Sequence, residues 1–372
     1  MSSGRYQRIV AKFGTNVLTA GTDRLDLEVM SSLVGQVARL HRQGAEVLIV
    51  SSGAIACGRH RLGNPQERRD IPFRQVLASV GQSYLMQAYE ELFRWHDIVV
   101  AQTLLTKRDL ADRQGYLNTR NTLLALLELR AVPIVNENDV VAVEEIEGAK
   151  IGDNDNLSAL VANLVDAELL VLLTDQAGLY TADPRHDPSA RLIERVDRID
   201  KEIEQLSGDS AARGVGGMAT KIQAAKLATA GGTHVVIADG REKDILTRLA
   251  EGEAVGTLFP PTVDRLESRK RWMLAGLSLK GSIVVDGGAV RALRQEKRSL
   301  LPAGVRRVEG SFERGDAVAI CDGEGQRIAC GIANYGAADI EAIRGLRSER
   351  IEEALGHEYG AEVVHRDNLV LL

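Results

Sequence analysis

The sequence is poor in aromatic residues and in cysteine. Aromatics make up 4% of its 372 residues, so the core has to be built from Ala, Val, Leu and Ile. The three cysteines, Cys57, Cys321 and Cys330, share no metal-ligand spacing. So sparse and odd a set argues against a disulfide framework and favours a reducing compartment.

Long apolar runs are also missing. No stretch approaches the ~18 apolar residues that are needed to span a bilayer. The first residues, MSSGRYQRIVAKFG, lack the apolar segment of a signal peptide. We therefore expect a cytoplasmic protein with no membrane partner.

The chain has no excess of positive charge and no visible hydrolytic or metal centre. Its formal net charge is -6, which gives no overall attraction to nucleic acid or to an anionic membrane. The 7 histidines are scattered without partners at metal spacing, and no Ser-His-Asp set is apparent. Locally, however, residues 264–314 contain 12 Lys and Arg against 6 Asp and Glu, so this segment is basic.

Short apolar runs alternate with helical patterns over the first two thirds of the chain. Strands are expected at 8–13, 47–50, 98–105, 132–135, 169–173 and 233–238, and helices at 27–43, 73–95, 118–129, 157–165 and 217–230. The strands are nearly continuous runs of Val, Ile and Leu, as expected when helices cover both faces of a sheet. The pattern predicts an α/β fold with a largely parallel sheet.

The alternation ends at Gly256–Pro261, and short β-like runs follow at 282–285, 305–308, 317–320 and 327–332. Turns such as Asp286-Gly287-Gly288 separate these runs. The sequence therefore predicts an α/β domain over 1–260, a linker over 261–280, a small β-rich domain over 281–359 and a tail over 360–372.

Small, polar and acidic residues cluster where the predicted strands of the first domain end. They are Gly14-Thr15, Ser51-Ser52-Gly53, Asn136–Asp139 and Thr174-Asp175. Ligands of parallel sheets bind at the carboxyl ends of the strands, so we expect a site there.

Two lysines stand beside glycines that can bring backbone N–H groups close to an anion. Lys12 lies in an apolar strand and precedes Gly14, and Lys221 ends the glycine-rich segment 214–221 at the start of a helix. The alternatives are a strand-end lysine that reaches solvent and a flexible loop. The loop is not a Walker A motif, and its match to the dinucleotide fingerprint fails because no strand precedes it.

Asn136–Asp139 and Asp153–Asn156 are dense clusters of amides and carboxylates. The second cluster fails the EF-hand pattern, because Leu157 and Ser158 replace a ligand and the turn glycine. Asx turns ahead of a helix explain one or two of these residues more easily than eight. Two lysines, glycine-rich amides and acidic organisers together favour phosphoryl transfer, which needs positioning and cations.

These motifs resemble the glutamate 5-kinase family of the amino acid kinase superfamily. The resemblance rests on KFGTNVLT at 12–19, SSGAI at 51–55, NEND at 136–139, GDNDNLSA at 152–159, LLTDQAGLYTADP at 172–184 and GGMATK at 216–221. It implies a three-layer αβα kinase domain that converts ATP and L-glutamate into ADP and L-glutamyl 5-phosphate, the first step of proline synthesis from glutamate. Residues 281–359 resemble a PUA domain, a small β-rich fold of RNA-modifying enzymes.

The resemblance also implies a role for each matching residue. Lys12 and Lys221 would contact the transferring phosphoryl group, and Asp155 would orient both lysines. L-Glutamate would bind to Ser52, Asp139 and Asn154. ATP would bind to Lys12, Gly14, Thr174, Asp175, Val215, Gly216, Gly217, Met218, Ala219, Thr220 and Lys221.

Further expectations come from the resemblance alone. Mg²⁺ would accompany ATP, proline would act as feedback inhibitor, RNA would bind the PUA-like domain, and the chain would form a homo-oligomer, either a dimer or a tetramer. Three departures from the family pattern stand out: Asn16 and Ser51 replace Ser and Thr, Val215 replaces Thr, and 145–151 is longer than usual.

Two rival functions stay open at this point. One is another amino acid kinase, acting on aspartate, acetylglutamate or a nucleotide monophosphate, which would share the fold and the lysines. The other is an RNA-binding protein in which the first domain is only a scaffold. Ser52, Asp139 and Asn154 favour glutamate over the first rival, and the intact pair Lys12 and Lys221 argues against the second.

Overall fold

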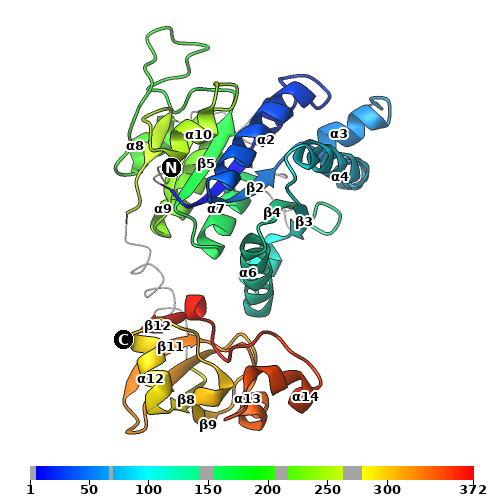
Figure 1. Cartoon of the computed structure of the whole chain (residues 1–372). Coiled ribbons are helices and arrows are strands. Elements are labelled where there is room, and N and C mark those ends of the chain that lie inside the picture. The colour runs from blue at the N-terminus through cyan, green and yellow to red at the C-terminus, as the bar shows by residue number, and fades with distance from the viewer. Residues whose placement is uncertain (1–5, 67–69, 143–153, 207–216, 263–278) are drawn as a thin grey trace. The chain divides into compact units, whose positions relative to one another are not determined.

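The computed structural model describes residues 6–66, 70–142, 154–206, 217–262 and 279–372. The chain divides into two units (Figure 1). The first comprises residues 1–112 and 118–265, and the second comprises 266–372 together with 113–117.

The first unit is built on a seven-stranded sheet with the order β3-β4-β2-β1-β5-β6-β7. Strands β1 to β6 run parallel to one another, and β7 runs antiparallel to β6 at one edge. The strands are β1 (Arg8–Phe13), β2 (Glu46–Ser51), β3 (Val100–Leu105), β4 (Val132–Glu137), β5 (Leu169–Thr174), β6 (His234–Asp239) and β7 (Thr257–Phe259).

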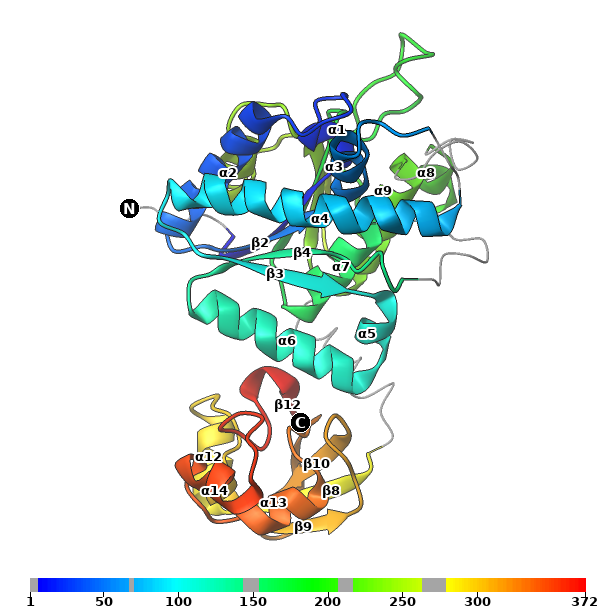
Figure 2. The ribbon, with the colours of Figure 1, turned by 90° about the vertical axis from the view of Figure 1, so that its right-hand side faces the viewer.

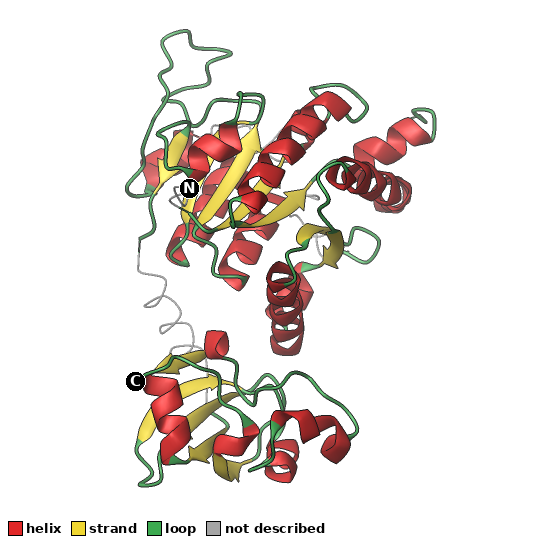
Figure 3. Cartoon of the chain, in the orientation of Figure 1, coloured by secondary structure: helices red, strands yellow, loops and turns green. Residues whose placement is uncertain are grey.

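Helices lie on both faces of this sheet (Figure 3). They are α1 (Thr15–Leu18), α2 (Leu27–Arg42), α3 (Ala54–Arg61), α4 (Ile71–Arg94), α5 (Lys107–Ala111), α6 (Arg113–Glu128), α7 (Asn154–Leu164), α8 (Lys201–Leu206), α9 (Met218–Ala230) and α10 (Ile245–Ala250). Figure 2 shows α4 and α6 on opposite sides of β3 and β4. The predicted three-layer αβα fold with a mainly parallel sheet is confirmed.

Successive side chains of β1 point to opposite faces of the sheet and so pack against different helices. Ile9, Ala11 and Phe13 belong to one core, to which α2, α4 and α10 also contribute buried residues. Val10 and Lys12 point to the opposite face, because successive side chains of a strand alternate. That face is covered by α7, which packs on β1, and by α9, which packs on α7 and β6.

Two local predictions were wrong. The strand at 233–238 was expected to be the last of the first domain, but Thr257–Phe259 forms β7 and pairs with Val235–Ile237 of β6. A three-residue edge strand between a glycine and two prolines leaves almost no periodic signal. The helix expected from Leu157 begins at Asn154, so Asn154, Asp155 and Asn156 lie in its first turn.

The second unit has its own five-stranded sheet, with the order β12-β11-β10-β8-β9. Its strands are β8 (Gly281–Val285), β9 (Val305–Gly310), β10 (Ala317–Cys321), β11 (Arg327–Ile332) and β12 (Leu369–Leu371), and its helices are α12 (Gly287–Arg294), α13 (Ala337–Ile343) and α14 (Ile351–Leu355). The predicted β-rich character is confirmed. The expected tail 360–372 is not separate, however, because β12 pairs with β11. Most of the expected linker 261–280 lies outside the described residues.

Helices α3 and α4 touch through their backbones. A Cβ added at Gly58 would lie 1.8 Å from the carbonyl oxygen of Leu77, and one added at Gly81 would lie 1.8 Å from that of Ala54. Only glycine fits at either position. This contact fixes α4 against α3, which begins directly after the strand-end segment Ser51–Gly53.

Replacing either glycine by alanine should therefore force the two helices apart. We expect Gly58→Ala and Gly81→Ala each to lower the free energy of unfolding by about 2 kcal/mol or more, as overpacked sites do. Gly35→Ala in α2 is the matched control, since a Cβ there meets nothing within 4 Å. It should be neutral or stabilising by up to about 1 kcal/mol. Equal urea midpoints for Gly58→Ala and Gly35→Ala would contradict the packing argument.

Candidate active site

The strand order places a topological switch point at β1. The chain fills one side of β1 with β2, β4 and β3, and then returns to fill the other side with β5, β6 and β7. Phe13 at the end of β1 is in register with Ser51 of β2 and Leu173 of β5. The residues that follow these three strands therefore meet at one edge of the sheet, where ligands of such folds bind.

Lys12 and Lys221 converge on the carboxylate of Asp155. Lys12 Nζ lies 2.8 Å from Asp155 Oδ1, and Lys221 Nζ lies 3.1 Å from Asp155 Oδ2. The two lysines are each 5% exposed and Asp155 is 1% exposed. One residue comes from β1, one from the first turn of α7 and one from the first turn of α9. The pairing thus joins three segments that lie far apart in the sequence, with 66 positions between Asp155 and Lys221 alone.

The three charges do not cancel. Burial alone would raise the pKa of Asp155, but the ammonium groups of Lys12 and Lys221 and the hydroxyl of Thr220 outweigh it and lower that pKa to about 2. Burial lowers the pKa of Lys221, against the attraction of Asp155. With both lysines protonated, one positive charge is left over in a place that is closed to solvent. Such a place attracts an anion strongly.

Thr220 and Gly14 shape the surroundings of the two lysines. The Thr220 hydroxyl donates to Asp155 Oδ2 over 2.8 Å and also lies 2.7 Å from the carbonyl oxygen of Gly217. A Cβ at Gly14 would lie 3.7 Å from Lys12 Nζ and 3.1 Å from the Leu173 carbonyl oxygen. A glycine at position 14 therefore keeps the space beside the Lys12 ammonium open.

On the β2 and β4 side, the amide of Asn154 joins the ends of two strands. Its Nδ2 donates to Ser51 O over 3.0 Å, to Ser52 Oγ over 3.1 Å and to Asn136 Oδ1 over 3.0 Å. Asn154 is 5% exposed, and its Oδ1 accepts no hydrogen bond from the described part of the chain. A buried acceptor without a donor is rare, and it fits a ligand that brings one.

Asp139, two residues beyond β4, carries a second carboxylate whose surroundings matter. Burial raises the pKa of its carboxyl to about 6, and the positive charge of Arg74 opposes that shift only in part. A desolvated carboxylate of this kind gains from a cationic ligand group.

On the β5 and β6 side, Asp175 is held by its neighbours. Its carboxylate accepts from Asn16 Nδ2 over 3.0 Å and from Thr174 Oγ1 over 3.1 Å, and its carbonyl oxygen accepts from Arg241 over 2.8 Å. Burial would raise the pKa of Asp175, but the hydrogen bond from Asn16 and others lower it. Asn16 thus ties the segment after β1 to the end of β5.

Two family models match the sequence. The amino acid kinase family matches residues 7–239, and the PUA domain matches residues 281–355. A glutamate 5-kinase of Dehalococcoides mccartyi is 54% identical over 373 residues, with 100% of both chains covered. A glutamate 5-kinase of Herpetosiphon aurantiacus is 54% identical over 371 residues, again with 100% of both chains covered. The chain belongs to the amino acid kinase family.

More distant relatives carry the same name. A glutamate 5-kinase of Chromohalobacter salexigens is 50% identical over 368 residues, covering 99% of this chain and 97% of its own. Among solved structures, the UMP kinase of Bacillus anthracis covers 69% of this chain and 97% of its own, at 16% identity and a TM-score of 0.47. The resemblance to glutamate 5-kinases that the motifs indicated is confirmed, and so is the PUA domain.

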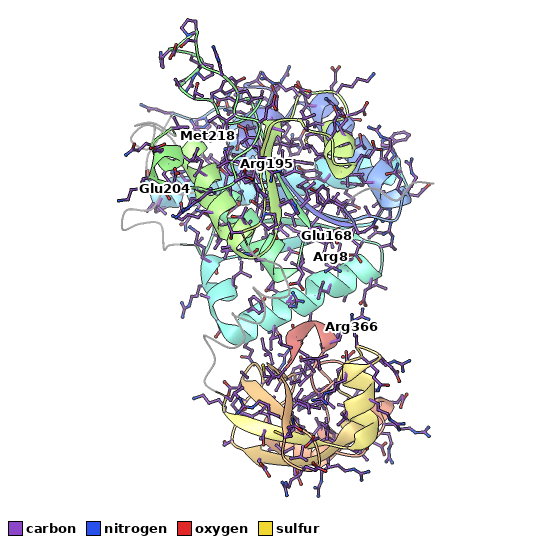
Figure 4. The ribbon with its side chains drawn as sticks, turned by 90° about the vertical axis from the view of Figure 1, so that its left-hand side faces the viewer. Arg8, Glu168, Arg195, Glu204, Met218 and Arg366 are labelled. Atoms are coloured by element: carbon purple, nitrogen blue, oxygen red, sulfur yellow. The ribbon has the colours of Figure 1, made fainter. Side chains whose placement is uncertain are left out.

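The structure of this amino acid kinase accounts for most of the sequence-predicted site residues. It brings Lys12, Gly14, Asp155, Thr220 and Lys221 together at the switch point, with Ser52 and Asn154 on one side and Thr174 and Asp175 on the other. Gly217 caps α9, and Met218, labelled in Figure 4, opens that helix with Ala219. Val215, Gly216 and the segment 145–151 lie outside the described residues.

Sequence reasoning missed the contacts that arrange this site. Asn16 was noted only as a departure from the family pattern, and Thr220 only as an ATP ligand, although its hydroxyl bonds to Asp155. Asn136 was included in a cluster without a role of its own. Gln82, which accepts from Asn136 Nδ2 over 2.7 Å, was not considered at all. A polar residue within a helical pattern gives no signal of a partner that is distant in the sequence.

Within the described ranges, no group of three or more His, Cys, Asp or Glu side chains could hold a metal ion. Both carboxylate oxygens of Asp155 already face lysines, and those of Asp175 face Asn16 and Thr174.

No helix in the part of the chain that the structure describes has the length and apolar character needed to cross a bilayer.

Replacing Asp155 by asparagine should leave two buried ammonium groups without their carboxylate. We expect Asp155→Asn to lower the free energy of unfolding at pH 7 by about 3 kcal/mol or more. Because the pKa of Asp155 falls from 3.8 to about 2 on folding, the difference from the parent chain should narrow as pH drops through that range.

Asp197→Asn is the control. Asp197 pairs with Arg195 over 2.7 Å, but its side chain is 73% exposed. Its loss should cost below about 1 kcal/mol. Urea unfolding measures the loss of unfolding free energy in each variant. Equal losses in Asp155→Asn and Asp197→Asn would show that Asp155 does not stabilise the two buried ammonium groups.

Proposed function

We propose that this protein transfers the γ-phosphoryl group of ATP to the side-chain carboxylate of L-glutamate. The products are ADP and L-glutamyl 5-phosphate, and the reaction is the first step of proline biosynthesis from glutamate. The observation that carries this proposal is the convergence of Lys12 and Lys221 on one buried carboxylate, between an acceptor side at β2 and β4 and a nucleotide side at β5 and β6.

The reaction needs charge and position more than proton transfer. The side-chain carboxylate of glutamate is already ionised at neutral pH, so one of its oxygens can attack the γ-phosphorus without a base. A carboxyl O–P bond forms as the bond between the γ-phosphorus and the β,γ-bridging oxygen breaks, and that oxygen leaves with ADP. Negative charge on the transferring group is met by the ammonium groups of Lys12 and Lys221. Asp155 holds these two groups in place and is not itself the nucleophile.

Glutamate recognition is assigned to Ser52, Asp139 and Asn154. Asn154 Oδ1, which has no donor among the described residues, and the desolvated Asp139 carboxylate both suit the α-ammonium group of the substrate. Ser52, whose Oγ accepts from Asn154, completes the wall of this side.

ATP is assigned to the other side of β1. Thr174, Asp175 and the segment from Val215 to Lys221 would hold the nucleotide, with Gly14 beside its terminal phosphate. Magnesium belongs to the substrate MgATP and is carried by the phosphate oxygens, since the carboxylates nearest the lysines are already engaged.

Regulation and partners follow from the family. Proline would compete with glutamate, the chain would assemble as a dimer or tetramer, and it would act in the cytoplasm. The PUA domain would bind RNA, with exposed arginines such as Arg306 and Arg307, 70% and 64% exposed, available to contact phosphates. Proline inhibition assays, light scattering, cell fractionation and salt-dependent RNA binding test these four proposals in turn.

The lysine pair gives the direct test of the proposed reaction. We expect coupled turnover of ATP with glutamate but not with aspartate, acetylglutamate or uridine monophosphate. Lys12→Ala and Lys221→Ala should each lower kcat by ~100-fold or more, because each removes charge stabilisation at the transferring group.

Lys226→Ala is the control on the same helix as Lys221, since Lys226 pairs with Glu204 at the surface and is 60% exposed. It should keep wild-type kcat. Wild-type turnover in both site variants, or equal turnover with another acceptor, would refute the assignment.

The ionisation of Asp139 predicts a pH dependence. Its carboxylate binds the substrate ammonium only when ionised, and its pKa is about 6 in the free protein. We expect kcat/KM for glutamate to fall as pH drops through about 6. Asp139→Asn should lower kcat/KM and flatten that profile. An unchanged profile in the variant would assign the ionisation to another group.

A further inference from the structure

Backbone groups at two points fix the orientation of the Asn154 amide. Asn154 Nδ2 donates to the carbonyl oxygen of Ser51, and the N–H of Glu137 donates to Asn136 Oδ1 over 2.9 Å. Asn136 Oδ1 is also an acceptor for Asn154 Nδ2. Turning either amide over would set donor against donor or acceptor against acceptor. Asn154 Oδ1 therefore has to face away from these partners.

Gln82 supplies the remaining acceptor of this network. Asn136 is 2% exposed, and its Nδ2 donates to Gln82 Oε1 over 2.7 Å. The hydrogen bonds run in one direction, from Asn154 to Asn136 and from Asn136 to Gln82. Without Gln82 Oε1, the Asn136 amide would lose the acceptor of its Nδ2, and only the N–H of Glu137 and the contact with Asn154 would favour this direction.

The same face of α4 holds the segment that follows β4. Gln75 stands seven residues, or about two turns, before Gln82. Its Nε2 donates to the carbonyl oxygen of Val140 over 3.1 Å. Gln82 is hydrogen-bonded to Asn136 and Gln75 to Val140. These two partners lie on either side of Asp139 in the sequence. Helix α4 is itself fixed by its backbone contact with α3 at Gly58 and Gly81.

We propose that Gln82 is a positioning residue for substrate recognition, which acts through Asn136 to hold Asn154 Oδ1 toward the α-ammonium group of L-glutamate. This inference rests on the proposed function and adds a determinant of specificity to the same site. Gln82 itself need not touch the substrate. Its contribution should therefore exist only for acceptors that carry an ammonium group.

This dependence on the ammonium group distinguishes a positioning role of Gln82 from a purely structural one. Glutarate has both carboxylates of glutamate and lacks the ammonium group. A Gln82 variant that only loosened the fold would weaken glutamate and glutarate alike. A variant that lets the Asn154 amide turn should weaken glutamate alone.

The test compares Gln82→Met, which keeps the length of the side chain and removes the acceptor, with Gln82→Glu, which keeps an acceptor oxygen. We expect Gln82→Met to raise KM for glutamate about tenfold, the factor that corresponds to one hydrogen bond of ordinary strength. KM for ATP and kcat should stay within about twofold of the parent chain. Gln82→Glu should recover most of the lost affinity. Glutarate, measured as a competitor of glutamate, should keep the same Ki in all three proteins.

Two controls complete the experiment. Gln87→Met changes an exposed glutamine of the same helix, which pairs with Glu91, and should leave every constant unchanged. In an Asn154→Ala background, Gln82→Met should have no further effect on KM for glutamate, because the group that it positions is gone.

The outcomes separate the two levels of inference. Unchanged KM for glutamate in Gln82→Met, or an equal rise in the Ki of glutarate, would overturn the positioning role and leave the proposed function standing. If the parent chain bound glutarate as tightly as glutamate, the assignment of Asn154 and Asp139 to the ammonium group would itself be wrong. No turnover of glutamate by the parent chain would overturn the proposed function.

Discussion

The site depends on one buried carboxylate that holds two buried cations. Asp155 is within 3.1 Å of both Lys12 and Lys221, and it lies in the first turn of a helix that packs on the central strand. Two ammonium groups this close would repel each other strongly without it. With it, they stay in place and still leave one unbalanced positive charge. We propose that the anion which completes this arrangement is the phosphoryl group being transferred.

The sheet topology determines which residues lie on each side of this charge. Because β1 lies between β2 and β5, the end of Lys12's strand has the residues proposed to bind the acceptor on one side and those proposed to bind the nucleotide on the other. The second lysine comes from α9, so the transferring group would be held from both the sheet and the helical layer. Tight helix contacts farther out, such as Gly58 against Leu77, fix the helix that carries Gln82.

Much of this could be predicted from sequence because its signals are local. The run at Arg8–Phe13 and the stripe over 27–43 predict their strand and helix directly, and the polar residues after each strand predict the site. Contacts between segments leave no such signal. Gln82 meets Asn136, a partner 54 residues away, and β7 is too short to show a period. The resemblance named the residues that would meet the substrate, while the structure was needed to find those that orient them.

A structure with a transition-state analogue tests the central claim most directly. The complex would contain MgADP, aluminium fluoride and L-glutamate, with aluminium fluoride in the place of the transferring phosphoryl group. Both Lys12 Nζ and Lys221 Nζ should lie within about 3 Å of its fluorine atoms, as charge-assisted hydrogen bonds do. A complex in which either ammonium group pointed elsewhere, with the fluoride held by other cations, would contradict the shared role of the two lysines.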